Sequence, residues 1–136
     1  MAADAPQIAA EEDRRALNEI TRKIIGSAQI VSTVLGPGFL EKIYENALQI
    51  ELAKRGLKTQ QQEPLVIRYD QQIVGTYVTD LLVEGKVLVE LKAVSGLERA
   101  HRLQCVHYLK ATGLRIGLLL NFGRGHLEVE RVVNRF

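Results

Sequence analysis

The chain has 136 residues, of which 46% are hydrophobic and 25% charged, and its formal net charge is +2. A chain of this size and composition forms one globular domain with its own core, which excludes a disordered or fibrous protein. It has no apolar stretch of about 20 residues that would span a membrane, and its single cysteine excludes an internal disulfide, so we expect a cytoplasmic protein.

Two helices are predicted first. Residues 1–15, rich in alanine and acidic residues, are expected to form a flexible N-terminal tail before a single domain at residues 16–136. From Leu17 to Leu35 apolar residues recur every three or four positions, which predicts an amphipathic helix. Gly36-Pro37-Gly38 ends it, and a second helix is predicted from about Phe39 to Lys54. Four residues of the second helix are expected to face the core: Leu40, Ile43, Ala47 and Leu48.

The apolar period then changes to that of β-strands. Three segments rich in β-branched residues are predicted to form an antiparallel meander: Pro64–Asp70, Gln72–Glu84 and Lys86–Val94. Helical spacing returns from Leu97 to Thr112. The segments "LRIGLLLNF" and "HLEVERVV" are predicted as two final strands, joined by a hairpin at Gly123-Arg124-Gly125. The order α-α-β-β-β-α-β-β predicts the α/β fold class, with a mixed α+β sheet.

The segment "VELKA" places two charges inside an apolar strand. Strand side chains alternate, so Glu90 and Lys92 share one face, as they would on the outer side of any half-exposed strand. Asp80 lies as far before Gly85 as Glu90 lies after it. A three-residue turn centred on Gly85 would therefore put the two carboxylates opposite one another, roughly 5 Å apart.

Two opposed carboxylates repel each other unless something compensates their charge. A divalent cation between Asp80 and Glu90 would do so, and carboxylate, water and substrate oxygens are the usual ligands of Mg²⁺. Lys92 could then stabilise a pentavalent phosphate or help to deprotonate an attacking water. A proton shared by the two acids, or an arginine between them, remains as the alternative. We favour the metal interpretation.

The arrangement resembles the D…(D/E)xK motif of the PD-(D/E)XK nuclease superfamily, whose core is a helix, three strands, a helix and a fourth strand. Thr79-Asp80 stands here for the superfamily's Pro-Asp. The structural motif Gly38, Glu41 and Tyr44 matches GxxExxY, and "TDLLVEGKVLVELKA", "HRLQCVHYLKATG" and "LLLNFG" are similar to further blocks of the GxxExxY protein family. The resemblance covers about Ile20 to Val133 and implies a restriction-endonuclease-like core.

The resemblance also implies an activity and its residues. It implies a nuclease that uses Mg or Mn, in which Glu41, Asp80 and Glu90 hold the metal together with the carbonyl of Leu91. Lys92 would support the attacking water, and Gln104 on the third helix would contact the site as a further catalytic residue. From the residues alone, Glu41 is better explained as an exposed acid that favours the helix dipole in the first turn. For Gln104, a solvated helix face is an equal alternative.

The expected partner is nucleic acid, with DNA favoured. Basic residues able to line the site with positive charge occur on the third helix and after it: Arg99, Arg102, Lys110 and Arg115. His101 and Cys105 are also four residues apart on this helix, but two ligands do not make a zinc site. Two alternatives stay open: an inert nuclease-like fold that binds or self-assembles into an oligomer or filament, and a nuclease active only with a helper protein.

Overall fold

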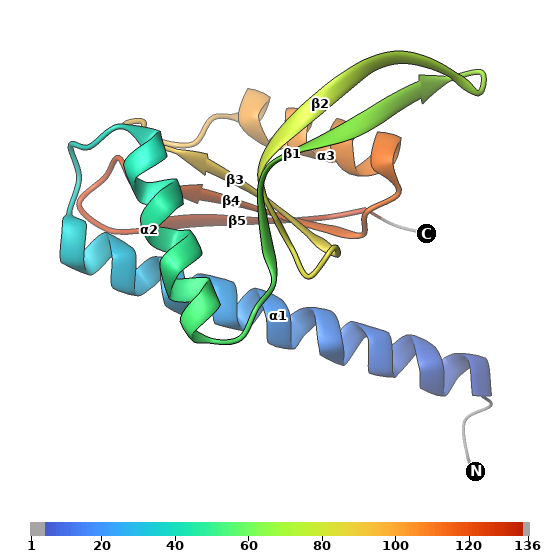
Figure 1. Cartoon of the computed structure of the whole chain (residues 1–136), viewed down its shortest axis with the longest axis horizontal. Helices are drawn as coiled ribbons and strands as arrows, with labels where there is room; N and C mark the ends of the chain where they lie inside the picture. The colour runs from blue at the N-terminus through green and yellow to red at the C-terminus, as the bar shows by residue number, and fades with distance from the viewer. Residues whose placement is uncertain (1–4, 135–136) are drawn as a thin grey trace.

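The computed structural model describes residues 5–134. Within them the elements are α1 (Ala5–Leu35), α2 (Glu41–Lys54), β1 (Thr59–Tyr69), β2 (Gln72–Val83), β3 (Val87–Lys92), α3 (Arg99–Thr112), β4 (Ile116–Asn121) and β5 (Glu128–Val133) (Figure 1). This is the predicted order of helices and strands, and the predicted mixed α+β fold is confirmed.

The strands form one sheet in the order β1-β2-β3-β4-β5. The β1, β2 and β3 strands make the predicted antiparallel meander, and β5 is antiparallel to β4. Only β3 and β4 are parallel, with α3 as the crossover between them. Because they are parallel, the carboxyl ends of β3 and β4 lie at the same end of the sheet, with Lys92 opposite Asn121.

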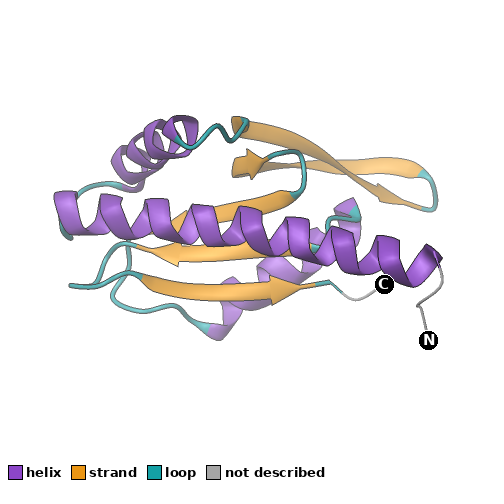
Figure 2. Cartoon of the chain, turned by 90° about the horizontal axis from the view of Figure 1, so that it is seen from below, coloured by secondary structure: helices purple, strands orange, loops and turns teal. Residues whose placement is uncertain are grey.

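Helices cover both faces of the sheet, and each face has its own core. The larger core joins α1 and α2 to one face and includes Ile24, Leu48 and Val89. The smaller core lies under α3 and includes Leu88 and Leu109. Figure 2 shows α1 running along the sheet. Among residues 5–134, no helix has both the length and the hydropathy needed to cross a bilayer.

The first helix begins at Ala5, not at Leu17 as predicted. Residues 5–15, which we expected to belong to a flexible tail, are therefore helical, and residues 1–4 lie outside the described part of the chain. All of residues 5–16 are exposed. The prediction depended on apolar periodicity, which this segment lacks, whereas its alanine, glutamate, glutamine and arginine residues favour a helix without any packing.

The buried face of α2 also differs from the prediction. Leu40 precedes the helix and is 78% exposed, and Ile43 is 42% exposed. The residues that pack inward are Tyr44, Leu48 and Leu52, which recur every four positions. A short helix rich in apolar residues offers several overlapping stripes, and contact with α1 selects among them.

The turn between β2 and β3 has the length that would place Asp80 opposite Glu90. Val83 pairs with Val87, Leu82 with Leu88 and Leu81 with Val89, so three residues centred on Gly85 connect the strands. At the far end of β2, Asp70 and Gln71 both have positive φ angles, as in the tight two-residue turns of β-hairpins. The β1–β2 hairpin extends well beyond the other strands (Figure 1).

Candidate functional site

Asp80 and Glu90 lie where the ladder between β2 and β3 ends. The two strands pair from Val83 and Val87 as far as Leu81 and Val89, and Asp80 and Glu90 follow one step further along. Asp80 Oδ2 accepts a hydrogen bond of 2.9 Å from the amide of Leu91. Thus the Asp80 side chain holds the backbone of β3 just past the last residues of the ladder.

Glu90 is held from the opposite strand. Its Oε1 atom accepts a hydrogen bond of 2.7 Å from the hydroxyl of Thr79, and only 9% of its surface is exposed. Thr79 stands where the superfamily motif has proline, which could not make this bond. Burial and the negative charge of Asp80 raise the pKa of Glu90 to about 7, although contacts with Tyr77 and Thr79 oppose the rise.

Two tyrosines extend the polar site towards α3. Tyr77 from β2 interacts with the Glu90 carboxylate, and its ring stacks on that of Tyr108, with centroids 3.4 Å apart. Burial and the charge of Glu90 raise the pKa of Tyr77, so its hydroxyl stays protonated and able to donate. Sequence reasoning missed Tyr77, because a tyrosine in an exposed hairpin strand carries no chemical signal of its own.

Glu41, in the first turn of α2, is electrostatically linked to the same site. Partial burial raises the pKa of Glu41, the positive charge of Lys92 opposes this rise, and the negative charge of Asp80 adds to it. The structure therefore brings Glu41 within electrostatic range of Asp80 and Lys92, although they lie 39 and 51 positions after it in the sequence. Glu41 remains exposed, whereas Glu90 is buried.

The acids do not form a closed three-ligand cluster. Among residues 5–134, no three Asp, Glu, His or Cys side chains lie close enough together to hold a metal ion. The donors nevertheless suit a hard divalent cation, because Mg²⁺ is commonly bound by one or two carboxylates and completed by water and substrate phosphates. Burial and, after it, the negative charge of Asp80 raise the pKa of Glu90, and a bound cation would favour the ionised form of this acid. The residues present therefore fit such an ion.

The GxxExxY segment has a structural role that its tyrosine explains. Tyr44 is fully buried, and its hydroxyl donates to the carbonyl of Gly36 at 2.6 Å and accepts from the amide of Phe39 at 3.1 Å. Gly38 between them has a φ of +114°, which only glycine adopts easily. The Tyr44 ring stacks on Phe122 after β4. This tyrosine thus fixes the turn that places Glu41.

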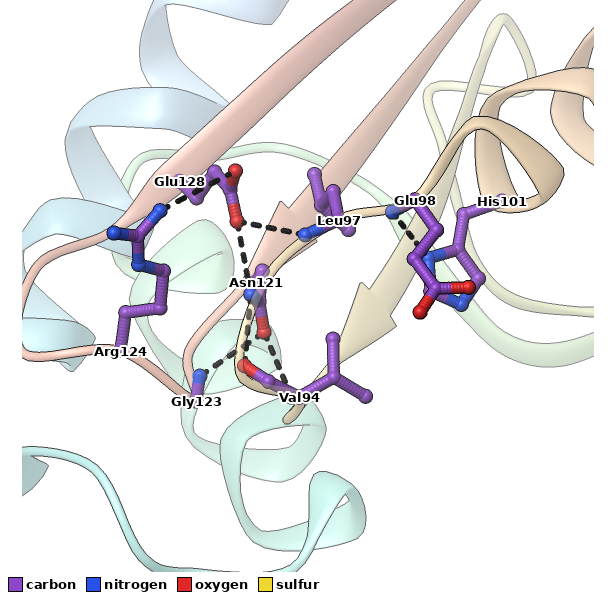
Figure 3. A network of polar contacts seen from close by, with 8 residues as sticks. All are labelled: Val94, Leu97, Glu98, His101, Asn121, Gly123, Arg124 and Glu128. Carbon is purple, nitrogen blue, oxygen red and sulfur yellow. Dashed lines mark hydrogen bonds and ion pairs between the residues drawn. The ribbon is translucent and has the colours of Figure 1, made fainter.

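A second set of contacts fixes the chain that follows Lys92 (Figure 3). The buried Asn121 side chain accepts from the amides of Val94 and Gly123 and donates to the Val94 carbonyl and to Glu128. Glu128 also accepts from the amide of Leu97, and these hydrogen bonds lower its pKa. Sequence reasoning missed both polar residues; the asparagine that ends the apolar run "IGLLLN" was the available signal.

The predicted residues of α3 are distributed along the helix. Gln104 is exposed, one turn before the stacked Tyr108. Arg99 and Arg102 are near the end where β3 finishes, and Arg102 pairs with Glu130 at 2.8 Å. Lys110 lies in the last turn, about 16 Å from Arg99 along the helix axis. It belongs to the other end of the molecule.

The remaining predictions on this side concern Arg115 and the His101–Cys105 pair. Arg115 precedes β4 and is therefore also far from Lys92. His101 Nδ1 accepts from the amide of Glu98, at the start of α3, and Cys105 is buried. His101 thus helps to cap α3, and Cys105 packs in the smaller core.

Comparison with known families decides the relationship. A family model described as the PD-(D/E)XK nuclease superfamily matches residues 18–134. The chain belongs to the PD-(D/E)XK nuclease superfamily. No curated protein and no solved structure matches it.

Membership agrees with the fold and with the position of the motif. The mixed five-stranded sheet between helices is consistent with a restriction-endonuclease-like PD-(D/E)XK fold. Asp80 lies on β2, and Glu90 and Lys92 lie on β3, at the point where the two strands stop pairing. Nucleases of this superfamily act on nucleic acid and generally use divalent metals.

Proposed function

We propose that this PD-(D/E)XK protein is a nuclease that hydrolyses phosphodiester bonds of nucleic acid, with DNA as the first substrate to examine. The observation that carries the proposal is the Asp80–Glu90 pair. Two acidic residues are held at the end of the β2–β3 ladder by Leu91 and Thr79, and the pKa of one of them is raised by burial and by the other. Such a pair favours binding of a divalent cation.

The metal ligands in this proposal are Asp80, Glu90, the Leu91 carbonyl and, with water between, Glu41. Mg or Mn bound there would act as a Lewis acid on a phosphate oxygen. The chain's own groups supply the rest. The Leu91 amide orients the Asp80 carboxylate, and the Thr79 hydroxyl orients the Glu90 carboxylate. Lys92 holds a positive charge next to the attacking water.

The nucleic acid would approach along α3. Gln104 is exposed there and available to contact the substrate beside the Tyr77–Tyr108 stack, while Arg99 and Arg102 provide positive charge at the same end. We also propose that the chain belongs to the GxxExxY family, and the contacts of Tyr44, which fix the turn before Glu41, support that proposal.

The test is cleavage of supercoiled plasmid and of single-stranded DNA and RNA with Mg²⁺ or Mn²⁺. Asp80→Asn preserves an acceptor for the Leu91 amide but removes the charge, so we expect activity to fall at least about 100-fold. Glu12→Gln, an exposed glutamate of α1, is the matched control and should cleave like the unsubstituted protein. Equal activity in Asp80→Asn and the control would refute the assignment of the site.

One feature favours a second function, self-assembly of an inert nuclease-like module. The β1 strand is a sheet edge of 11 residues, and the hairpin that it forms with β2 exposes several large apolar side chains. These are Val66, Tyr69, Ile73, Val74 and Val78. An apolar edge strand of this kind is suited to pairing with another copy of the chain or with a helper protein.

Sedimentation velocity together with Mn²⁺ titration separates the two functions. An inert module predicts a defined oligomer or filament that Val74→Lys dissolves, and no change in assembly or fold when Asp80 is replaced by asparagine. The nuclease predicts Mn²⁺ binding that Asp80→Asn weakens. A monomer that binds metal but cleaves nothing would favour the nuclease that requires a helper protein.

A further inference from the structure

An arginine-lined cavity lies at the end of the sheet remote from Asp80 and Glu90. It has a volume of about 580 Å³ and is enclosed by α1, the start of β4 and the end of β5. Its polar lining consists of Arg14, Asn18, Arg115, Arg131 and Asn134. Figure 2 shows the N-terminal end of α1 continuing past the end of β5.

The cavity has a strong excess of positive charge. Among residues 5–134, none of those that line it is acidic. Arg131 Nη2 donates to Asn18 Oδ1 at 2.6 Å, which fixes its guanidinium between β5 and α1. A carboxylate, that of Asp13, lies 3.8 Å from Arg115. Because the Asp13 side chain is 72% exposed to solvent, it neutralises the positive charge of Arg115 only weakly.

This cavity is separate from the nuclease motif. Ile116 lines it, whereas Leu119 of the same strand lies opposite Glu90 and Asn121 lies opposite Lys92. Three steps along a strand correspond to about 10 Å, and five steps to about 16 Å. A group bound between the three arginines would not touch the acids.

We propose that this cavity binds phosphate groups. Arginine presents a planar fork of N–H donors that matches phosphate oxygens, and three guanidiniums in one recess suit an anion with more than one negative charge better than a single carboxylate. Both a nucleoside triphosphate and the backbone of a nucleic acid carry this chemistry. The proposal stands without the nuclease function, because it uses none of the motif residues.

The experiment is titration calorimetry of the full chain in chloride buffer with EDTA, using sodium triphosphate and a 5′-phosphorylated oligothymidylate as separate probes. Arg131→Gln and Arg14→Gln should each weaken binding about tenfold, the loss expected for one charge-assisted contact. Arg68→Gln, an exposed arginine on the β1–β2 hairpin, is the control and should bind normally. Circular dichroism confirms that each variant is folded. Within residues 5–134, Arg14 makes no hydrogen bond or ion pair whose loss would complicate its replacement.

The two probes distinguish the sources of phosphate. Tight binding of triphosphate with a stoichiometry of one supports a nucleotide, and binding of the oligonucleotide alone supports a nucleic-acid backbone. No heat with either probe at millimolar concentration would overturn the proposal. Equal weakening by Arg68→Gln and Arg131→Gln would also overturn it, because general electrostatic attraction would then explain the binding. EDTA removes divalent metal, so failure of the nuclease assay has no bearing on this result.

Discussion

Asp80 Oδ2 and the amide nitrogen of Leu91 are 2.9 Å apart, and this hydrogen bond spans β2 and β3 between the two acids of the motif. A carboxylate thereby takes the place of a backbone carbonyl at the end of the ladder. Glu90, the residue just before Leu91 on β3, is held by a hydrogen bond from Thr79 on the other strand. Each acid is thus positioned by a hydrogen bond from the neighbouring strand, at the point where the backbone pairing of β2 and β3 ends.

Replacing Glu90 by glutamine should stabilise the metal-free protein at alkaline pH. Since the pKa of Glu90 is about 7 in the folded protein and 4.5 is the ordinary value, burial of the charge costs up to about 3 kcal/mol above pH 7. The favourable contribution of the protonated acid is complete below pH 4.5 and is lost as the pH rises through 7. Urea unfolding of Glu90→Gln should therefore show a gain at pH 8 and none near pH 4. A gain of the same size at both pH values would contradict the assigned cause.

Metal binding should strengthen with pH through the same range. A cation competes with the proton on Glu90, so the fraction of the ionised acid, and with it the affinity, should rise about tenfold between pH 6 and pH 8. Calorimetric titration with Mn²⁺ at both pH values measures this change. An affinity that does not vary between them would show that Glu90 is not a ligand.

Tyr44→Phe should destabilise the fold while preserving its packing. The substitution keeps the ring that stacks on Phe122 but removes the hydroxyl that serves the Gly36 carbonyl and the Phe39 amide. We expect a loss of about 1–3 kcal/mol in the free energy of unfolding, measured by urea denaturation. The matched control is Tyr69→Phe at the hairpin tip, where the side chain is 76% exposed. A loss of equal size in the control would dismiss the proposed role of the hydroxyl.

Gly123→Ala should disrupt the turn after β4. A Cβ atom at this position would clash with the carbonyl oxygen and the nitrogen of Val94, which are backbone atoms that cannot move independently. We expect a loss of more than about 2 kcal/mol in the free energy of unfolding. Gly125→Ala, with nothing within 4 Å of the added atom, should have little effect. Similar losses in both variants would mean that turn flexibility, not close approach, explains the glycine.

Periodicity predicted the elements well because their patterns are local. The alternation in "KVLVELKAV" and the helical spacing before Gly36 each require only neighbouring residues, and the breaker at Gly85 marked the turn but not its length. The start of α1 was wrong because an exposed helix has no apolar stripe. The inward face of α2 was wrong because Tyr44, and not Ile43, is buried, where its ring stacks on Phe122.

By itself the sequence determined the order of the elements and placed Asp80, Glu90 and Lys92 on two adjacent strands, since a short turn fixes the register of a hairpin. Only the tertiary structure decided what surrounds these residues. Burial beneath α3 raises the pKa of Glu90, and the folding of α2 across the sheet brings Glu41 near Asp80 and Lys92. The arginines of α1, β4 and β5 meet only because elements distant in sequence pack together. Desolvation and charge interactions depend on distances in space, which no local pattern contains.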